Sequence, residues 1–352
     1  MSSATASAPM STTPEPSCTN HDNRPPADLL VCIDENQLCA GVIPHALTMA
    51  TAFGGKVVLL HVVESAKPRA ANHLDPVDWE IRRREARARL SDLAQHYQTS
   101  DSEIEICILE GHATDQICAR ASEKAGDITV ISGQHDDGRH DTDTAQHIYA
   151  SNVARRVIEA DIGSVLMVPR SAFAQTPQTY SQILVPLDGS SIAESALPKA
   201  VRLAKAQKAT LTICHVTAQP DMPQIGPPDD EVDRLQGRLM QRARQVGRHY
   251  LNTVKDALHD CGISVKTAIV EGDDVRRALI ETVNRRNVDL LVMASHGQSG
   301  YTDVPSGHVT SYVLDHAQVP VLMVRQQHRT NGSHIVTDAK SKGVRPPSNA
   351  IQ

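Results

Sequence analysis

The sequence predicts an α/β fold in which two doubly wound domains follow one another, each a five-stranded parallel sheet with helices on both faces. Short apolar runs alternate with longer stretches of helical period, which is typical of β–α–β units. This alternation occurs twice, at an offset of about 155 residues. Aromatic residues make up only 3% of the 352 residues, so the cores are built from Val, Ile, Leu and Ala, which suits buried parallel strands.

The repeat can be followed residue by residue. Segment 31–34 (VCID) returns 154 positions later as 185–188 (VPLD), and segment 165–168 (VLMV) returns unchanged 156 positions later as 321–324. Matching order with small changes of offset indicates a duplicated unit with insertions in its loops. Two domains also agree with the usual domain size for a chain of this length.

In the first copy, one long helix is expected to begin after Pro76 and to carry Trp79, Leu90, Leu93 and Tyr97. The five apolar runs that predict its strands are 29–33, 57–62, 104–109, 128–131 and 165–168.

The second copy repeats the pattern with strands expected at 183–187, 209–216, 264–270, 290–293 and 319–324. Its long helix is expected over about 229–261, because apolar residues recur there at spacings of three and four. We expect this stripe to cover a sheet face; it consists of Val232, Leu235, Leu239, Ala243, Val246, Tyr250, Val254 and Leu258.

Composition sets the domain boundaries. The two folded units are expected at 27–170 and 180–326, joined by a linker at 171–179. The polar ends, 1–26 and 327–352, show no sustained period and are expected to be disordered tails.

Charge and targeting signals narrow the function classes. A formal net charge of −6 and a pI near 6.3 argue against a broad surface for nucleic acid or an anionic membrane. The run 82–84 (RRR) alternates with glutamates and is typical of a solvent-facing helix. No signal peptide or membrane span is evident, and the seven cysteines form no C-x-x-C pair, so we expect free thiols and a cytoplasmic location. The expected partners are a small molecule or a protein.

In an open α/β sheet, ligands bind beyond the carboxyl ends of the strands. In the second copy, Asp188 and the segments after Val216 and Met293 lie there. A glycine after a strand lets backbone N–H groups approach an anion, and the start of the helix near Gly307 adds donors and a positive dipole end. These features predict a phosphate cradle.

The spacing of this cradle resembles a family pattern. Ala294, Gly297, Gly307 and His308 fit the spacing Gly-x2-Gly-x9-Gly-(Ser/Thr) of the nucleotide-binding universal stress proteins. The resemblance covers nearly all of 27–326 and implies an adenine nucleotide alpha hydrolase-like fold in each domain. It also implies that the second domain binds ATP or another adenine nucleotide, with Mg as a companion ion.

The resemblance assigns roles to individual residues. Ala294 adds a methyl group where the family pattern has glycine, and His308 replaces a hydroxyl with a larger ring that can still donate a hydrogen bond. The implied adenosine pocket is lined by Pro186, Asp188, Val216 and Met293. The implied contacts to ribose and phosphates come from Ala294, Gly297, Gly307 and His308.

The first copy departs further from the pattern. Ser132 and His135 replace the first two glycines, six residues are added to the following loop, and 151–152 (SN) replaces Gly307 and His308. Asp34 remains, but a lone carboxylate after a strand also occurs as a helix cap. We therefore expect a degenerate site in a structural or regulatory copy.

Metal and enzyme interpretations are weaker. His61 and His215 occupy one repeated strand position, but a metal needs more ligands, and a packed core histidine explains them better. The segment 135–143 could hold a divalent cation, although a solvated insertion fits its composition better. No known catalytic motif occurs in a suitable context, so we expect no enzyme, while the resemblance leaves slow ATP hydrolysis open.

Two functions fit these features. One is a stress-response module in which nucleotide binding alters a surface for a protein partner. The other is a nucleotide-free interaction scaffold. A nucleotidyl transferase would need a His or Lys cluster after Asp188, where 189–191 reads GSS. The resemblance also implies that 165–168 pairs with 321–324 in an intramolecular pseudo-dimer, and that two chains could form a homodimer.

Overall fold

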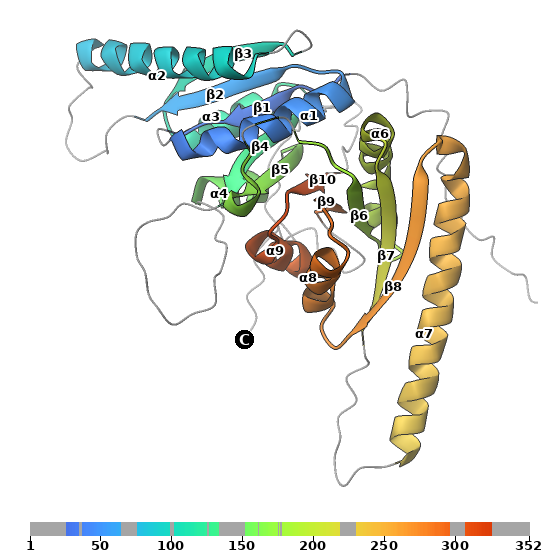
Figure 1. Ribbon diagram of the computed structural model, residues 1–352. Coiled ribbons are helices and arrows are strands. Elements are labelled where there is room, and N and C mark those ends of the chain that lie inside the picture. Colours follow the sequence, from blue (N-terminus) through green and yellow to red (C-terminus); the bar gives the residue numbers. More distant parts are fainter. Residues whose placement is uncertain are drawn as a thin grey trace, which may run out of the picture.

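The described strands form one sheet that runs through both copies (Figure 1). The computed structural model describes residues 26–34, 37–64, 76–98, 102–124, 127–133, 152–160, 162–174, 176, 178–218, 230–295 and 307–325. The ten strands lie in the order β3-β2-β1-β4-β5-β10-β9-β6-β7-β8.

The elements of the first copy follow the predicted alternation. Each strand lies within two residues of its expected bounds, and the long helix begins at Pro76. The elements are β1 (Leu29–Cys32), η2 (Gln37–Val42), α1 (Ile43–Phe53), β2 (Val57–Val63), α2 (Pro76–Tyr97), β3 (Ile104–Glu110), α3 (Ala113–Ser122), β4 (Ile128–Gly133), α4 (Asn152–Glu159), β5 (Ser164–Pro169) and η3 (Arg170–Ala172).

The second copy repeats the series, with α5 in the place of η2 and an added short helix, η4, after its long helix. Its elements are β6 (Gln182–Pro186), α5 (Ser191–Glu194), α6 (Leu197–Gln207), β7 (Thr210–Ala218), α7 (Asp230–Ala257), η4 (His259–Cys261), β8 (Ser264–Gly272), α8 (Val275–Arg285), β9 (Leu290–Ala294), α9 (His308–His316) and β10 (Val321–Val324).

Strand pairing shows the duplication and the seam between the copies. Within each copy the strands are parallel, and the two central strands, β1 and β4 or β6 and β9, are neighbours at the switch point of the doubly wound order. The copies meet where β5 and β10 pair antiparallel, with Leu322 opposite Leu166. These are the two strands that the resemblance implied would pair.

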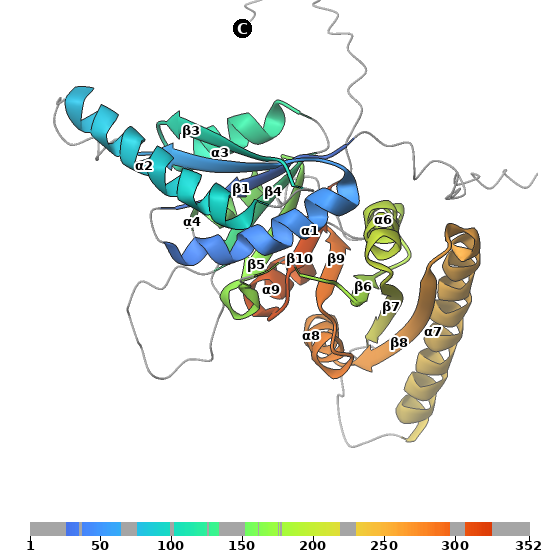
Figure 2. The same ribbon diagram turned by 45° about the horizontal axis from the view of Figure 1, so that its top comes forward.

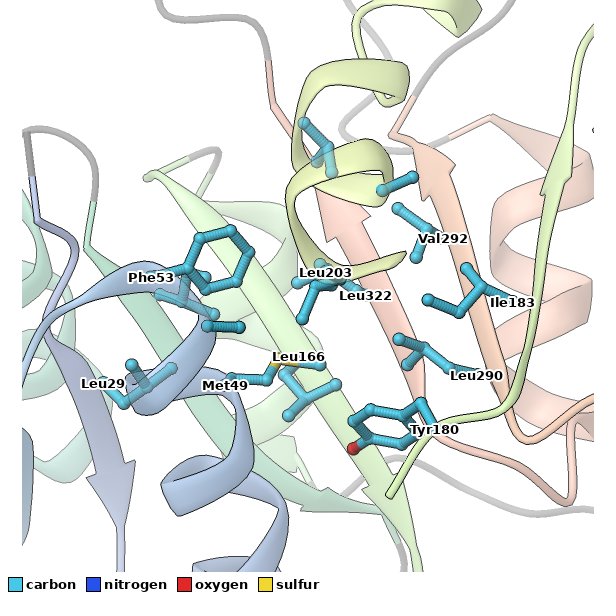
Figure 3. Close-up of a cluster of buried hydrophobic side chains, with 14 of the residues drawn as sticks. Leu29, Met49, Phe53, Leu166, Tyr180, Ile183, Leu203, Leu290, Val292 and Leu322 are labelled. Carbon is cyan, nitrogen blue, oxygen red and sulfur yellow. The ribbon is translucent and has the colours of Figure 1, made fainter. Parts of the chain in front are cut away.

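Helices cover both faces of this sheet (Figures 1 and 2). One buried cluster joins α1, α2, α6 and α7 to the sheet, and a second cluster on the other face joins α3, α4, α8 and α9. Figure 3 shows the first cluster crossing the seam, from Leu29 and Phe53 of the first copy to Ile183 and Leu290 of the second. The predicted α/β fold class is confirmed.

The prediction that the whole apolar stripe of α7 covers the sheet is wrong at three of its residues. Leu235, Leu239 and Val246 are 49%, 45% and 53% exposed. A helix turns by about 100° per residue, so Leu239 points roughly 80° away from Gly247, which lies against the sheet residues His215 and Ile269. The stripe therefore lies on a flank of α7, and only its C-terminal part, with Val254 and Leu258, is buried.

One expectation about the cysteines also needs correction. Cys32, Cys107, Cys118 and Cys214 are free thiols, but Cys261 is disulfide-bonded. The expectation that every cysteine is free is therefore wrong at Cys261.

Candidate functional site

The predicted site begins at the carboxyl end of β6. Pro186 is the last residue of this strand and is half-buried, and Asp188 follows two residues later. Because β6 pairs with β9 in parallel, Asp188 and the residues that end β9 lie at the same edge of the sheet. This edge is where ligands bind in open α/β sheets.

The turn after β6 is held by its own side chains. Asp188 Oδ1 accepts hydrogen bonds from the Ser190 backbone N–H at 2.9 Å and from the Ser190 hydroxyl at 2.6 Å. Ser190 Oγ in turn accepts from the Ala193 N–H at 3.1 Å and caps α5. Gly189 has a φ of +88°, in the left-handed region that glycine adopts without cost. The carboxylate of Asp188 is therefore tied to a defined loop.

A histidine on β7 is hydrogen-bonded to the start of the same loop. His215 Nδ1 donates to the carbonyl oxygen of Leu187 at 2.8 Å, and His61 of the first copy donates to Ile33 at the same distance. Val216, the next residue of β7, is half-buried. Both histidines are hydrogen-bonded parts of the fold, as we predicted.

The end of β9 and the start of α9 close the predicted phosphate loop. Met293 and Ala294 are buried in β9. The Gly307 N–H donates to the Ser295 carbonyl oxygen at 3.1 Å, and the Thr310 hydroxyl donates to the same oxygen at 3.1 Å. Ser295 and Gly307, the described residues on either side of the segment 296–306, are therefore hydrogen-bonded neighbours at the sheet edge.

The first turn of α9 is suited to an anion. Gly307 is its N-cap residue and has no side chain with which to cap the backbone N–H groups that follow. Uncapped N–H groups and the positive end of the helix dipole favour a negatively charged ligand. His308, the first residue of the helix, is exposed, so its ring is not buried in the core.

Seven of the eight predicted site residues fall within the described structure, and all seven lie on β6, β7, β9 or α9, or on the turns at their ends. Gly297 lies outside the described residues, as do His135, Ser151 and the segment 135–143. Sequence reasoning missed Ser190 and Thr310. A serine three positions before Ala193, at the start of α5, is an N-cap signal that could have identified Ser190.

The first copy contains a small cavity at the corresponding place. It has a volume of about 30 Å³, enough for a water molecule but far below the size of an adenosine pocket. Its lining residues are Ile33, Asp34, His61, Ala86, Arg89, Leu90 and Leu93.

No three His, Cys, Asp or Glu side chains of the described residues gather as a metal site. None of the helices in this part of the chain is long and apolar enough to cross a membrane.

Curated proteins resemble the chain over a length of about one copy. Universal stress protein MJ0531 of Methanocaldococcus jannaschii is 27% identical over 147 residues, which cover 42% of this chain and 83% of the relative. Universal stress protein YxiE of Bacillus subtilis is 27% identical over 152 residues, or 42% of this chain and 99% of the relative.

A solved structure extends the likeness to the tandem arrangement. A universal stress protein from Archaeoglobus fulgidus matches 85% of this chain and 98% of its own length, with a TM-score of 0.57 and 17% identity. At this identity the likeness shows the fold alone. The sequence pattern of the universal stress protein family matches residues 28–169 and again 179–325. The chain therefore belongs to the universal stress protein family and carries two of its domains in tandem.

Proposed function

We propose that the second domain binds ATP or a related adenine nucleotide and that the protein acts as a stress-response regulatory module. One observation carries this proposal: Ser295, at the end of β9, is hydrogen-bonded to Gly307, the N-cap residue of α9, on the same edge of the sheet as Asp188. The family pattern places phosphates at such a turn, and backbone N–H groups favour them.

Different residues of the site suit different parts of the nucleotide. The Asp188 carboxylate can accept hydrogen bonds from the adenosine moiety, while Val216 and Met293 offer apolar surface to the base. The N–H groups of the first turn of α9, and the ring N–H of His308, can donate to phosphate oxygens. Mg²⁺ would accompany the phosphates as a hard cation with oxygen ligands.

Calorimetric titration of the purified protein with ATP, with and without Mg²⁺, tests the proposal. We expect heat from one site per chain. Asp188→Asn should weaken binding at least tenfold, because it removes the charge of the acceptor. Asp260→Asn is the matched control, since Asp260 is exposed on η4. Absence of heat with every adenine nucleotide would refute the proposal.

The proposed action is binding rather than catalysis, in the cytoplasm. We expect no described side chain at the site to act as a nucleophile or a general base on the phosphates. The native protein incubated with ATP should therefore release ADP no faster than the Asp188→Asn variant does. Cell fractionation tests the location.

A nucleotide-free interaction scaffold is the second candidate, and the exposed flank of α7 favours it. Leu235, Leu239 and Val246 are bordered by the exposed Arg238 and Arg242, and residues 234–254 contain no Asp or Glu. Such a surface fits a partner helix with apolar and acidic side chains. If the scaffold is correct, the native chain binds no nucleotide, while the double variant Ala294→Gly, His308→Ser does.

A further inference from the structure

A tyrosine on α7 contacts the loop that carries Asp188. The Tyr250 hydroxyl donates to Glu194 Oε1 at 2.8 Å, which joins α7 to the end of α5. Both residues are half-buried. The Tyr250 ring also lies edge-on to His215, with ring centroids 6.4 Å apart. Through these two contacts α7 reaches the turn after β6.

Tyr250 keeps its proton and therefore remains a hydrogen-bond donor. Burial raises its pKa far above the ordinary value, and the hydrogen bond to Glu194 and the nearby charges of Glu194 and Asp188 raise it further. An interaction with the backbone N–H of Gly189 opposes this only in part. The phenol is therefore available to donate to Glu194, at the end of the loop.

The loop 187–194 is thus fixed from two sides. His215 holds the carbonyl group of Leu187 at the end of β6, and Tyr250 holds Glu194 seven residues later. Asp188 and Ser190 lie between these two anchors. A change in the position of Asp188 would therefore be transmitted to Tyr250 and α7.

We propose that Tyr250 is a positioning residue for the nucleotide site: it holds the loop 187–194 in the conformation that presents Asp188, and it couples occupancy of the site to α7. This inference rests on the proposed function of the second domain. It assigns a role to a residue outside the nucleotide contacts themselves.

The first copy lacks this contact. Ala86 and Arg89 line a cavity with His61, at the same three-residue spacing with which Gly247 and Tyr250 approach His215. Arg89 therefore stands where the second copy has Tyr250, and Asp34 faces the cavity there. The tyrosine anchor is present in the copy that keeps the glycine spacing and absent from the degenerate copy.

The Tyr250→Phe variant of the full chain tests the inference by ATP titration. It removes one oxygen atom, and we expect roughly tenfold weaker binding, as for a lost hydrogen bond to a charged group. Glu194→Gln keeps an acceptor for the phenol and should bind within about threefold of the native chain. Tyr312→Phe, on α9, is the matched control and should bind like the native chain.

The coupling between the nucleotide site and α7 can be measured by hydrogen exchange. A merely structural role of Tyr250 would not change this measurement. In the native chain, ATP should slow hydrogen exchange at backbone amides in residues 246–254 of α7. In Tyr250→Phe at saturating ATP this slowing should disappear, while thermal stability without ATP changes little. Glu194→Ala should reproduce both effects if Tyr250→Phe fails to fold.

The outcomes separate the two proposals. If the native chain binds ATP and Tyr250→Phe and Glu194→Ala bind it equally well, the positioning role is wrong and the proposed function stands. If ATP slows exchange in α7 of Tyr250→Phe as in the native chain, the coupling is wrong. If the native chain binds no adenine nucleotide, both proposals fail.

Discussion

Helices α1 and α6 come from the same repeated segment of the sequence, but they differ in burial. Helix α1 begins Ile43-Pro44-His45-Ala46, and α6 begins Leu197-Pro198-Lys199-Ala200, an offset of 154. Ten of the eleven residues of α1 are buried, compared with five of eleven in α6. The two helices pack against each other across the seam, and α1 is the more enclosed of the pair.

The contacts made by these helices are correspondingly unequal. On α1, His45 contacts the Ala172 carbonyl oxygen at 2.7 Å and the Tyr180 hydroxyl at 2.8 Å, in and after the linker. On α6, Arg202 donates to the carbonyl oxygens of Ala52 and Phe53 at the C-terminal end of α1. Duplicated elements have thus acquired different partners because only one of them meets the connection between the copies.

The loops at the two sites differ in the same way. Asp188 is followed by Gly189, whose positive φ allows the tight turn into α5. Asp34 is followed by Glu35 and Asn36, and the next described element is η2. The copies therefore share a sheet and its supporting histidines, while the turns that could bind a ligand have diverged.

The largest effect is expected where the copies are joined. Leu166 and Leu322 face each other across the β5–β10 seam and are fully buried. Leu322→Ala should lower the free energy of unfolding by about 3 kcal/mol, as buried leucine-to-alanine changes commonly do. Urea unfolding should show one transition, because both copies share this sheet. Leu166→Ala should cost a similar amount, and two separate transitions would show that the copies fold independently.

Variants at Arg202 test the contact between α1 and α6. Arg202→Ala should lower the free energy of unfolding by about 2 kcal/mol, because two charge-assisted hydrogen bonds to the last carbonyl groups of α1 are lost. Arg202→Lys should recover only part of it, since lysine lacks the planar fork of donors. Chemical denaturation measures both. Equal stability of Arg202→Ala and the native chain would show that the contact is dispensable.

The sequence predicted the strands well because apolar runs of β-branched residues repeat in both copies. It also predicted that the seven described candidate residues lie in or beside the ends of β6, β7 and β9 and the start of α9, because local pattern and topology agree there. The prediction that the apolar stripe of α7 faces the sheet failed. Apolar residues spaced three and four apart define a stripe along a helix, but this spacing does not tell whether the stripe faces the sheet or points some 80° away from it. Sequence reasoning named Tyr250 only as part of the apolar stripe and missed its contact with Glu194, because the two residues meet only after α7 packs on the sheet.

The histidine of α1 should make the seam sensitive to acid. The Ala172 carbonyl can only accept, so His45 Nε2 carries the proton and Nδ1 accepts from Tyr180. Burial lowers the pKa of His45 below its ordinary value of 6.5. The unfolded chain therefore binds a proton at this position as the pH falls below 6.5, while the folded chain resists it, so stability is lost toward acid.

This loss can be as steep as about 1.4 kcal/mol per pH unit until the folded pKa is reached. Thermal unfolding of the native chain and of His45→Gln, from about pH 7.5 to about pH 5.5, should show a smaller decline for the variant. His259→Gln is the control, because His259 is exposed on η4 and should leave the decline unchanged. A decline of equal size in His45→Gln would contradict the assignment.

The smallest effect tests the turn that distinguishes the two sites. Gly189 has a φ of +88° and open space where a Cβ would lie, so Gly189→Ala should cost only backbone strain, about 1 kcal/mol. Gly262→Ala is a matched control, with a φ of +69°, equally open space and a position on the turn before β8. Both variants should lose similar stability in urea unfolding. Only Gly189→Ala should also weaken ATP binding, because only its turn carries Asp188; equal affinities in the two variants would separate the turn from the site.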